Sequence, residues 1–84
     1  MMDFKMEYSI SERTTNIDGI NMETYGVKLV QTYNDGRVLS LELPGITVHR
    51  SWAEKLLGMM ERGMVTIMTA EEIVEDFLEM QYNM

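Results

Sequence analysis

Apolar and polar residues alternate along the first half of the chain. The first run has apolar residues at every second position, which is typical of a strand with one buried face. These positions are Phe4, Met6, Tyr8 and Ile10. A second run, over about residues 22–33, repeats the alternation, with Gln31 as the one polar residue on its apolar face. The apolar positions of this second run are Tyr25, Val27, Leu29 and Tyr33. Two paired strands are therefore expected.

The turn between these runs predicts how the strands pair. Asp18-Gly19 is a common two-residue hairpin loop, and it sets Ile10 opposite Val27 and Tyr8 opposite Leu29. Further along, the same loop pairs Ile17 with Ile20 and Phe4 with Tyr33. A shift of one residue would set apolar side chains against polar ones, so the alternation selects this register.

A second turn leads to a third strand on the same face. A three-residue loop with Gly36 in the left-handed conformation places Leu29 opposite Leu41 and Val27 opposite Leu43. Pro44-Gly45 is expected to end this strand. Gly26, inside the second strand, indicates a bulge or the close approach of another backbone.

The second half of the chain has helical spacing over Ser51–Met80. Ser51 with Glu54, and Thr69 with Glu72, match capping boxes and predict the two helix starts. Two sets of apolar residues follow at helical intervals. They are Ala53, Leu56, Leu57 and Met60 in the first helix, and Ala70, Ile73, Val74, Phe77 and Leu78 in the second.

Three features mark the end of the first helix and the connection to the second. Gly63 is expected to be the residue just beyond the helix, and Gly58 in the helix interior indicates close packing against a neighbouring element. Residues 64–68 then form an apolar connector. The fold class is therefore α+β, a three-stranded antiparallel β-meander followed by a two-helix hairpin packed on one sheet face. It forms a single domain over 1–84, with the meander in 1–45 and the helices in 46–82.

Charge and composition narrow the functional classes. The 84 residues have a formal net charge of −7 and no cysteine. An acidic surface disfavours direct binding of nucleic acid or of an anionic membrane. The absence of disulfides, a signal peptide and a long apolar run favours a cytoplasmic protein. Residues 51–84 carry 7 acidic and 2 basic residues, against 7 and 5 in residues 1–50, so most of the acidic excess lies in the helices.

An acidic face on the second helix is the main candidate site. It consists of Glu71, Glu72, Glu75, Asp76 and Glu79. It is either a solvated helix face, with Glu71 and Glu72 favoured near the positive end of the helix dipole, or a surface for a basic partner. No histidine or calcium-loop spacing completes a metal site, and without Lys or Arg after position 69 this helix is not a DNA-reading helix.

Aromatic and histidine residues supply the remaining candidates. Trp52 either fastens the first helix to the sheet or is an anchor for a partner. His49 is the only histidine, and no nucleophile or carboxylate in the sequence pairs with it in a recognisable pattern. The tyrosines of the predicted sheet face are expected in the core, although such a face can also stack bases. No catalytic residue and no cofactor is expected.

Two short segments resemble a family of small uncharacterised proteins from clostridia and related Firmicutes. They are Thr24-Tyr25-Gly26-Val27 and the run from Ala70 to Leu78, within a similarity that spans about residues 8–78. Where that family tends to carry a His-Leu pair before the last helix, this chain has Met68-Thr69. The resemblance implies a bacterial cytosolic protein with a domain of unknown function, and it carries over no catalytic residue.

Three functional hypotheses remain. The first is a non-enzymatic protein–protein interaction or regulatory module that uses the acidic face, Trp52 or a sheet edge, with another protein or a second copy as partner. The second is an acidic inhibitor that mimics nucleic acid and blocks the basic groove of a nucleic-acid enzyme. The third, a small enzyme, has no visible acid/base or nucleophile constellation to support it.

Overall fold

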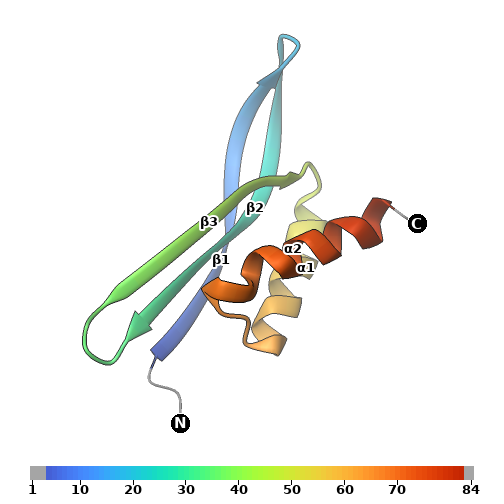
Figure 1. Cartoon of the computed structure of the whole chain (residues 1–84). Coiled ribbons are helices and arrows are strands. Elements are labelled where there is room, and N and C mark those ends of the chain that lie inside the picture. The colour runs from blue at the N-terminus through green and yellow to red at the C-terminus, as the bar shows by residue number, and fades with distance from the viewer. Residues whose placement is uncertain (1–3, 83–84) are drawn as a thin grey trace.

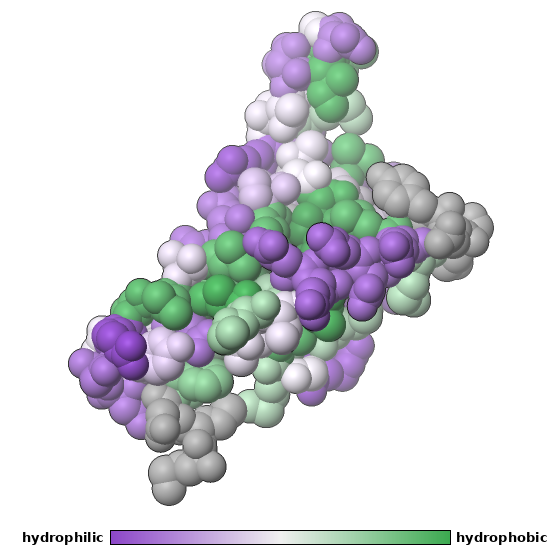
Figure 2. Space-filling model, viewed as in Figure 1, coloured by the Kyte–Doolittle hydropathy of each residue, from purple (hydrophilic) through white to green (hydrophobic). Residues whose placement is uncertain are grey.

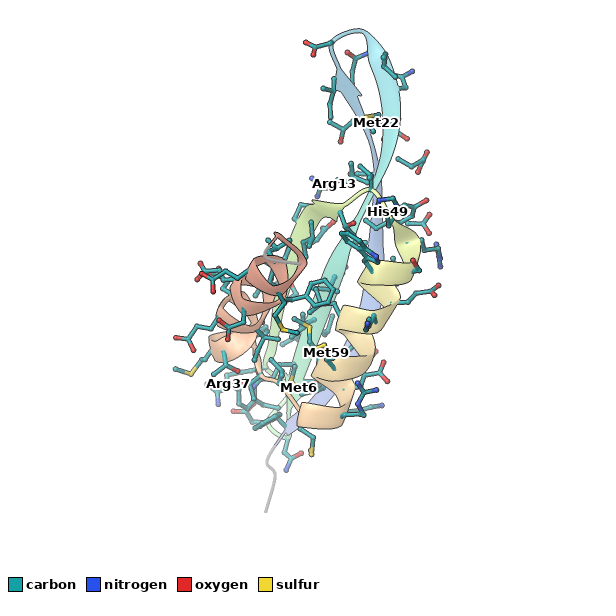
Figure 3. All side chains as sticks on the ribbon, turned by 90° about the vertical axis from the view of Figure 1, so that its right-hand side faces the viewer. Met6, Arg13, Met22, Arg37, His49 and Met59 are labelled. Atoms are coloured by element: carbon teal, nitrogen blue, oxygen red, sulfur yellow. The ribbon has the colours of Figure 1, made fainter. Side chains whose placement is uncertain are left out.

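The computed structural model describes residues 4–82 and has the expected βββαα order (Figure 1). The strands are β1 (Phe4–Ile17), β2 (Ile20–Tyr33) and β3 (Val38–Thr47), and the helices are α1 (Arg50–Gly63) and α2 (Ile67–Tyr82). The sheet order is β1-β2-β3, antiparallel throughout. Both helices lie on one side of the sheet, α1 mainly over β1 and β2, and α2 along β3 (Figures 1 and 3). The predicted fold class is confirmed.

Both predicted registers are confirmed. Tyr8 pairs with Leu29 and Ile10 with Val27 across the first hairpin, and Leu29 pairs with Leu41 across the second. Gly36 has a φ of 93°, as the three-residue loop requires. Cross-strand apolar pairing on one face therefore decides how these strands align.

The third strand does not end at Pro44-Gly45, as the sequence had indicated. It continues to Thr47, which pairs with Tyr25 after a register shift between Tyr25 and Val27. Gly26 lies at this irregularity, and a Cβ there would stand 2.8 Å from Pro44 Cα. The missing side chain of Gly26 lets the β3 backbone bend closely past β2, so the strand passes a proline that would otherwise stop it.

The core lies between the covered half of the sheet and the two helices. Its members with no exposed surface are Val27, Leu29, Ala53, Leu56, Met60 and Ala70, and Phe77 is 2% exposed. Met6 of β1 and Met59 of α1 lie between the layers and pack against this cluster (Figure 3). Gln31 is buried on the same face, and its Nε2 donates to the Tyr33 hydroxyl at 3.0 Å. This partner explains how a polar residue is tolerated there.

The first helix begins one residue before the predicted cap. His49 is the N-cap and makes no side-chain capping bond, so Ser51 lies inside the first turn. Arg50 is drawn into the helix because its guanidinium pairs with Glu54 one turn on and with Glu12 of β1. The capping-box prediction at Ser51 and Glu54 is therefore wrong, since Glu54 binds Arg50 instead.

The second helix also begins earlier than predicted. It starts at Ile67, which packs against the core. The Thr69 backbone N–H and hydroxyl both approach the Thr66 carbonyl, at 3.2 and 3.4 Å. Thr69 is thus a residue of the first turn and not a cap. The expected capping box with Glu72 is wrong, because burial of Ile67 extends the helix towards its N-terminus.

Two glycine predictions in α1 are also corrected. The left-handed residue that ends the helix is Met64, with φ 51° and ψ 46°, whereas Gly63 is the last helical residue. A Cβ at Gly58 would meet only the Arg62 side chain, at 3.4 Å. Gly58 therefore does not mark a close approach between two elements.

Candidate functional site

The long first hairpin extends beyond the layered body as a two-stranded arm. β3 follows β2 only as far as Tyr25, and every residue from Glu12 to Asn21 is exposed. Figure 3 shows the arm rising above both helices, with Arg13 at its base and Met22 further out. Polar side chains bond across it, such as the Thr14 hydroxyl to Glu23 Oε1 at 3.0 Å. Within residues 4–82, neither helix covers the arm and no third strand pairs with it.

A hollow of about 360 Å³ extends from the base of this arm to Ile17, the last residue of β1. We call it the arm-base hollow, and its lining residues are Ile17, Thr24, Gly45, Ile46, Thr47, Val48, His49, Trp52 and Leu78. They come from both arm strands, the end of β3, the start of α1 and the second half of α2. Figure 2 shows a hydrophobic area between the base of the arm and α2.

The rim of the arm-base hollow is apolar and open to solvent. Ile17, Val48 and Trp52 are 46%, 45% and 38% exposed. The polar groups in the lining are largely bonded within the chain, since the Thr24 hydroxyl donates to the Arg13 carbonyl at 3.2 Å and the Thr47 hydroxyl accepts from the His49 N–H at 3.0 Å. The hollow is therefore suited to apolar groups.

His49 and Trp52 form an aromatic pair at the start of α1. Their ring centroids are 4.8 Å apart, at an interplanar angle of 51°. No carboxylate lines the hollow beside His49, and no ion pair among residues 4–82 involves its imidazole. The geometry thus places Trp52 at a concave surface next to His49, without an arranged acid or nucleophile.

The acidic face of α2 is exposed along its whole length. Glu71, Glu72, Glu75, Asp76 and Glu79 are all exposed, and Figure 2 shows them as a continuous hydrophilic ridge. Within residues 4–82, no ion pair involves α2. Because α2 starts at Ile67, Glu71 and Glu72 lie in its second turn, where the helix dipole offers little compensation. The repulsion between these carboxylates is therefore unrelieved within the described part of the chain.

A second, smaller hollow separates this ridge from β3. It is lined by Leu43, Glu71, Val74 and Glu75 and has a volume of about 200 Å³. We call it the β3–α2 seam. The structure thus divides the predicted acidic face, since Glu71 and Glu75 border the seam while Glu72 and Asp76 do not line it.

Two tertiary contacts hold the elements around these surfaces. The Tyr8 hydroxyl donates to the Val65 carbonyl at 2.7 Å, and desolvation, followed by the nearby charge of Glu61, raises the pKa of Tyr8. On the opposite sheet face, Glu42 accepts from the Ser11 hydroxyl and from Arg13. The Ser11 hydrogen bond, above all, lowers the pKa of Glu42.

Within residues 4–82, no three acidic or histidine side chains are grouped so that they could hold a metal ion. None of the helices in this range combines the length and the apolar character needed to cross a bilayer.

The sequence pointed to Trp52 and the acidic ridge, but it missed most of the arm-base hollow. Ile46, Val48 and Leu78 meet there only because β3 continues past Pro44 and turns into α1. The exposed apolar residues that flank the first turn, Ile17 and Ile20, were the available signal. Their side chains are unusual for a solvated loop.

Comparison with known proteins assigns the chain to a family. Residues 1–80 match the family of unknown function DUF6514, so the chain belongs to this family. No curated protein and no solved structure matches the chain.

Proposed function

We propose that this member of the DUF6514 family is a non-enzymatic protein–protein interaction module that receives an apolar side chain of another protein in the arm-base hollow. The observation that carries the proposal is the open apolar rim formed by Ile17, Val48 and Trp52. Aromatic anchors beside a concave surface are typical centres of binding energy. A hollow of about 360 Å³ offers room for such a group.

A binding role is favoured over catalysis by the chemistry of the lining. General acid–base catalysis needs a titratable group within hydrogen-bond reach of a reacting atom and tuned by its neighbours. The His49 imidazole has an aromatic neighbour and no carboxylate in the hollow. Trp52 and the aliphatic groups around it supply affinity without supplying chemistry.

The electrostatics favour another protein as the partner over nucleic acid, a membrane or a second copy. With a net charge of −7, the chain repels phosphate-rich surfaces and its own copies at long range. The acidic face of α2, the helix whose Leu78 lines the hollow, attracts a partner with basic residues. We place this interaction in the cytoplasm of a clostridial or related bacterium, on the basis of the family resemblance and the absence of cysteine.

A second candidate function is an acidic inhibitor that mimics nucleic acid. It is favoured by the exposed carboxylates that follow one another along α2, none of which forms an ion pair within residues 4–82. Reversal of charge at Glu75, Asp76 and Glu79 separates the two candidates. The mimic loses its partner completely, whereas the module retains the contact in the hollow and binds more weakly.

Parallel capture from cell extract tests the proposed function. The tagged chain, Trp52→Ala and Val48→Glu are compared with Lys28→Ala, whose exposed side chain lies on the sheet face opposite the helices. We expect one protein to be retained by the wild type and by Lys28→Ala, and to be lost with both hollow variants. Circular dichroism establishes that each variant is folded. Retention of the same proteins by all four chains would contradict the proposal.

A further inference from the structure

The core is incompletely covered along β3. In the central strand, Val27 and Leu29 have no exposed surface. The β3 residues on the same face are more open, because Leu39 is 49% exposed and Leu41 and Leu43 are half-buried. β3 is an edge strand of the sheet, so its outer backbone groups have no strand neighbour within residues 4–82. An apolar edge of this kind is a template for an added strand.

The β3–α2 seam provides room beside this edge on the helix side. Leu43 and Val74 form its apolar part, and the carboxylates of Glu71 and Glu75 border it. Side chains of an added strand would alternate between the helix side and the opposite face. On the helix side, these side chains would contact Leu39 and Leu41 beside the first part of β3, and Glu71 and Glu75 beside Leu43.

The charges around the seam select the occupant. α2 carries five acidic residues and no Lys or Arg. The base directly before β3, Arg37, is already paired with Asp35, and Arg13 is paired with Glu42 on the other sheet face. A second copy bound at this edge would bring its own acidic α2 close to the β3–α2 seam, and the two acidic helices would repel each other. A segment with Lys or Arg on the helix side supplies the missing charge.

We propose that the edge of β3 over residues 38–43 takes an extended segment of the partner as a fourth strand. Its apolar residues would lie against Leu39 and Leu41, and its basic residues would pair with Glu71 and Glu75. Pro44 lacks an N–H and precedes the irregular part of β3, so the added strand stops there. This inference rests on the proposed function and names the partner's chemistry and mode of binding.

A designed peptide tests strand addition directly. The probe is a blocked nine-residue peptide with threonine at alternate positions and, between them, two valines followed by two lysines. A second probe reverses this order, because an added strand can run in either direction. We expect one of them to shift the backbone amide signals of residues 38–43 in a heteronuclear NMR titration. N-methylation of alternate peptide amides should abolish these shifts, because it removes the ladder donors.

Matched charge variants test the basic contact. Glu71→Gln with Glu75→Gln should weaken peptide binding about fivefold, the scale expected for two exposed ion pairs. Glu72→Gln with Asp76→Asn removes the same charge elsewhere on α2 and should change binding less than about twofold. Equal weakening by both pairs, or equal binding of the N-methylated peptide, would overturn the proposal.

The remaining outcomes separate this inference from the proposed function. Concentration-dependent shifts of residues 38–43 without peptide would assign the edge to a second copy and overturn the inference. If no amide of residues 38–43 responds to either peptide while Trp52→Ala still loses its captured protein, strand addition is wrong and the interaction module stands. If capture is insensitive to Trp52 and Val48, the proposed function fails whatever the peptides do.

Discussion

The two halves of the first hairpin share one register but have different surroundings. Near the open end of the hairpin, Tyr8 pairs with Leu29 beneath the helices, and Leu29 has no exposed surface. Near the turn, Ile17 pairs with Ile20, and these residues are 46% and 64% exposed. The same ladder of backbone hydrogen bonds runs through both halves. The covered half also has the helix layer and the third strand, which follows β2 only as far as Tyr25. We therefore expect the covered half to supply the stability, and the arm and its base to be available for binding.

The largest contrast should come from truncating one apolar residue in each half. Leu29→Ala leaves a cavity in the core and should lower the free energy of unfolding by about 2–5 kcal/mol. Ile20→Ala at the tip of the arm should change it by less than about 0.5 kcal/mol. Urea denaturation of both variants measures the difference. Similar losses in the two variants would mean that the arm is packed against something in the isolated chain.

Two glycine substitutions are expected to change stability in opposite directions. Gly26→Ala forces a Cβ against the backbone of Leu43 and Pro44 and should destabilise the chain by about 1–3 kcal/mol. Gly58→Ala lies in a helix with only the Arg62 side chain nearby and should stabilise it by about 0.5–1 kcal/mol. Thermal unfolding of each variant reports the sign. A neutral Gly26→Ala would show that β3 does not pass closely over β2.

Removal of the Tyr8 hydroxyl tests a link between the sheet and the helix connector. Tyr8→Phe leaves the Val65 carbonyl without its donor and should cost about 0.5–1.5 kcal/mol. Because the pKa of Tyr8 is raised in the folded chain, the unfolded tyrosine loses its proton first as pH rises. The wild type should therefore lose stability as the pH rises above 10.0, the ordinary pKa of a tyrosine side chain. Tyr8→Phe should lack this part of the alkaline loss.

The smallest effect is expected at Glu42, on the uncovered sheet face at the base of the arm. Its pKa is lowered in the folded chain, so the unfolded state takes up a proton first as pH falls. The contribution of Glu42 to stability is present above pH 4.5, the ordinary pKa of a glutamate side chain, and is lost as the pH falls below it. Denaturant titrations between acidic and neutral pH should show a shallower acid loss for Glu42→Gln than for the wild type. An identical pH profile would rule out the contact as a source of stability.

Strand pairing could be predicted because it depends on a repeated pattern, whereas each helix start depended on a few individual contacts. Alternation over many residues admits one register, and both turns agree with it. The capping boxes competed with the ion pairs of Arg50 and with the burial of Ile67, and these contacts prevailed. The pair of Arg50 with Glu54 is local, at i and i+4, but the contact of Arg50 with Glu12 and the burial of Ile67 depend on the folded chain.

The candidate site was predicted only in part for the same reason. Trp52 and the acidic face could be identified from residue type and helical spacing. The arm-base hollow requires the path of β3 past Pro44, which depends on the absent side chain of Gly26. The sequence indicated a bulge or a close approach at that glycine without indicating that the strand would continue. Val48 and Leu78 consequently meet at a place that no local pattern describes.

Residue-resolved amide hydrogen exchange of the isolated chain is the most direct test of the claim that the helix layer divides the hairpin. We predict that the protected amides around Val27–Leu29 exchange only through global unfolding, while those of the arm between Thr14 and Glu23 exchange through local opening at a much lower free energy. Equal protection in the two regions would contradict this account, because it would show that the arm is as firmly held as the core beneath the helices.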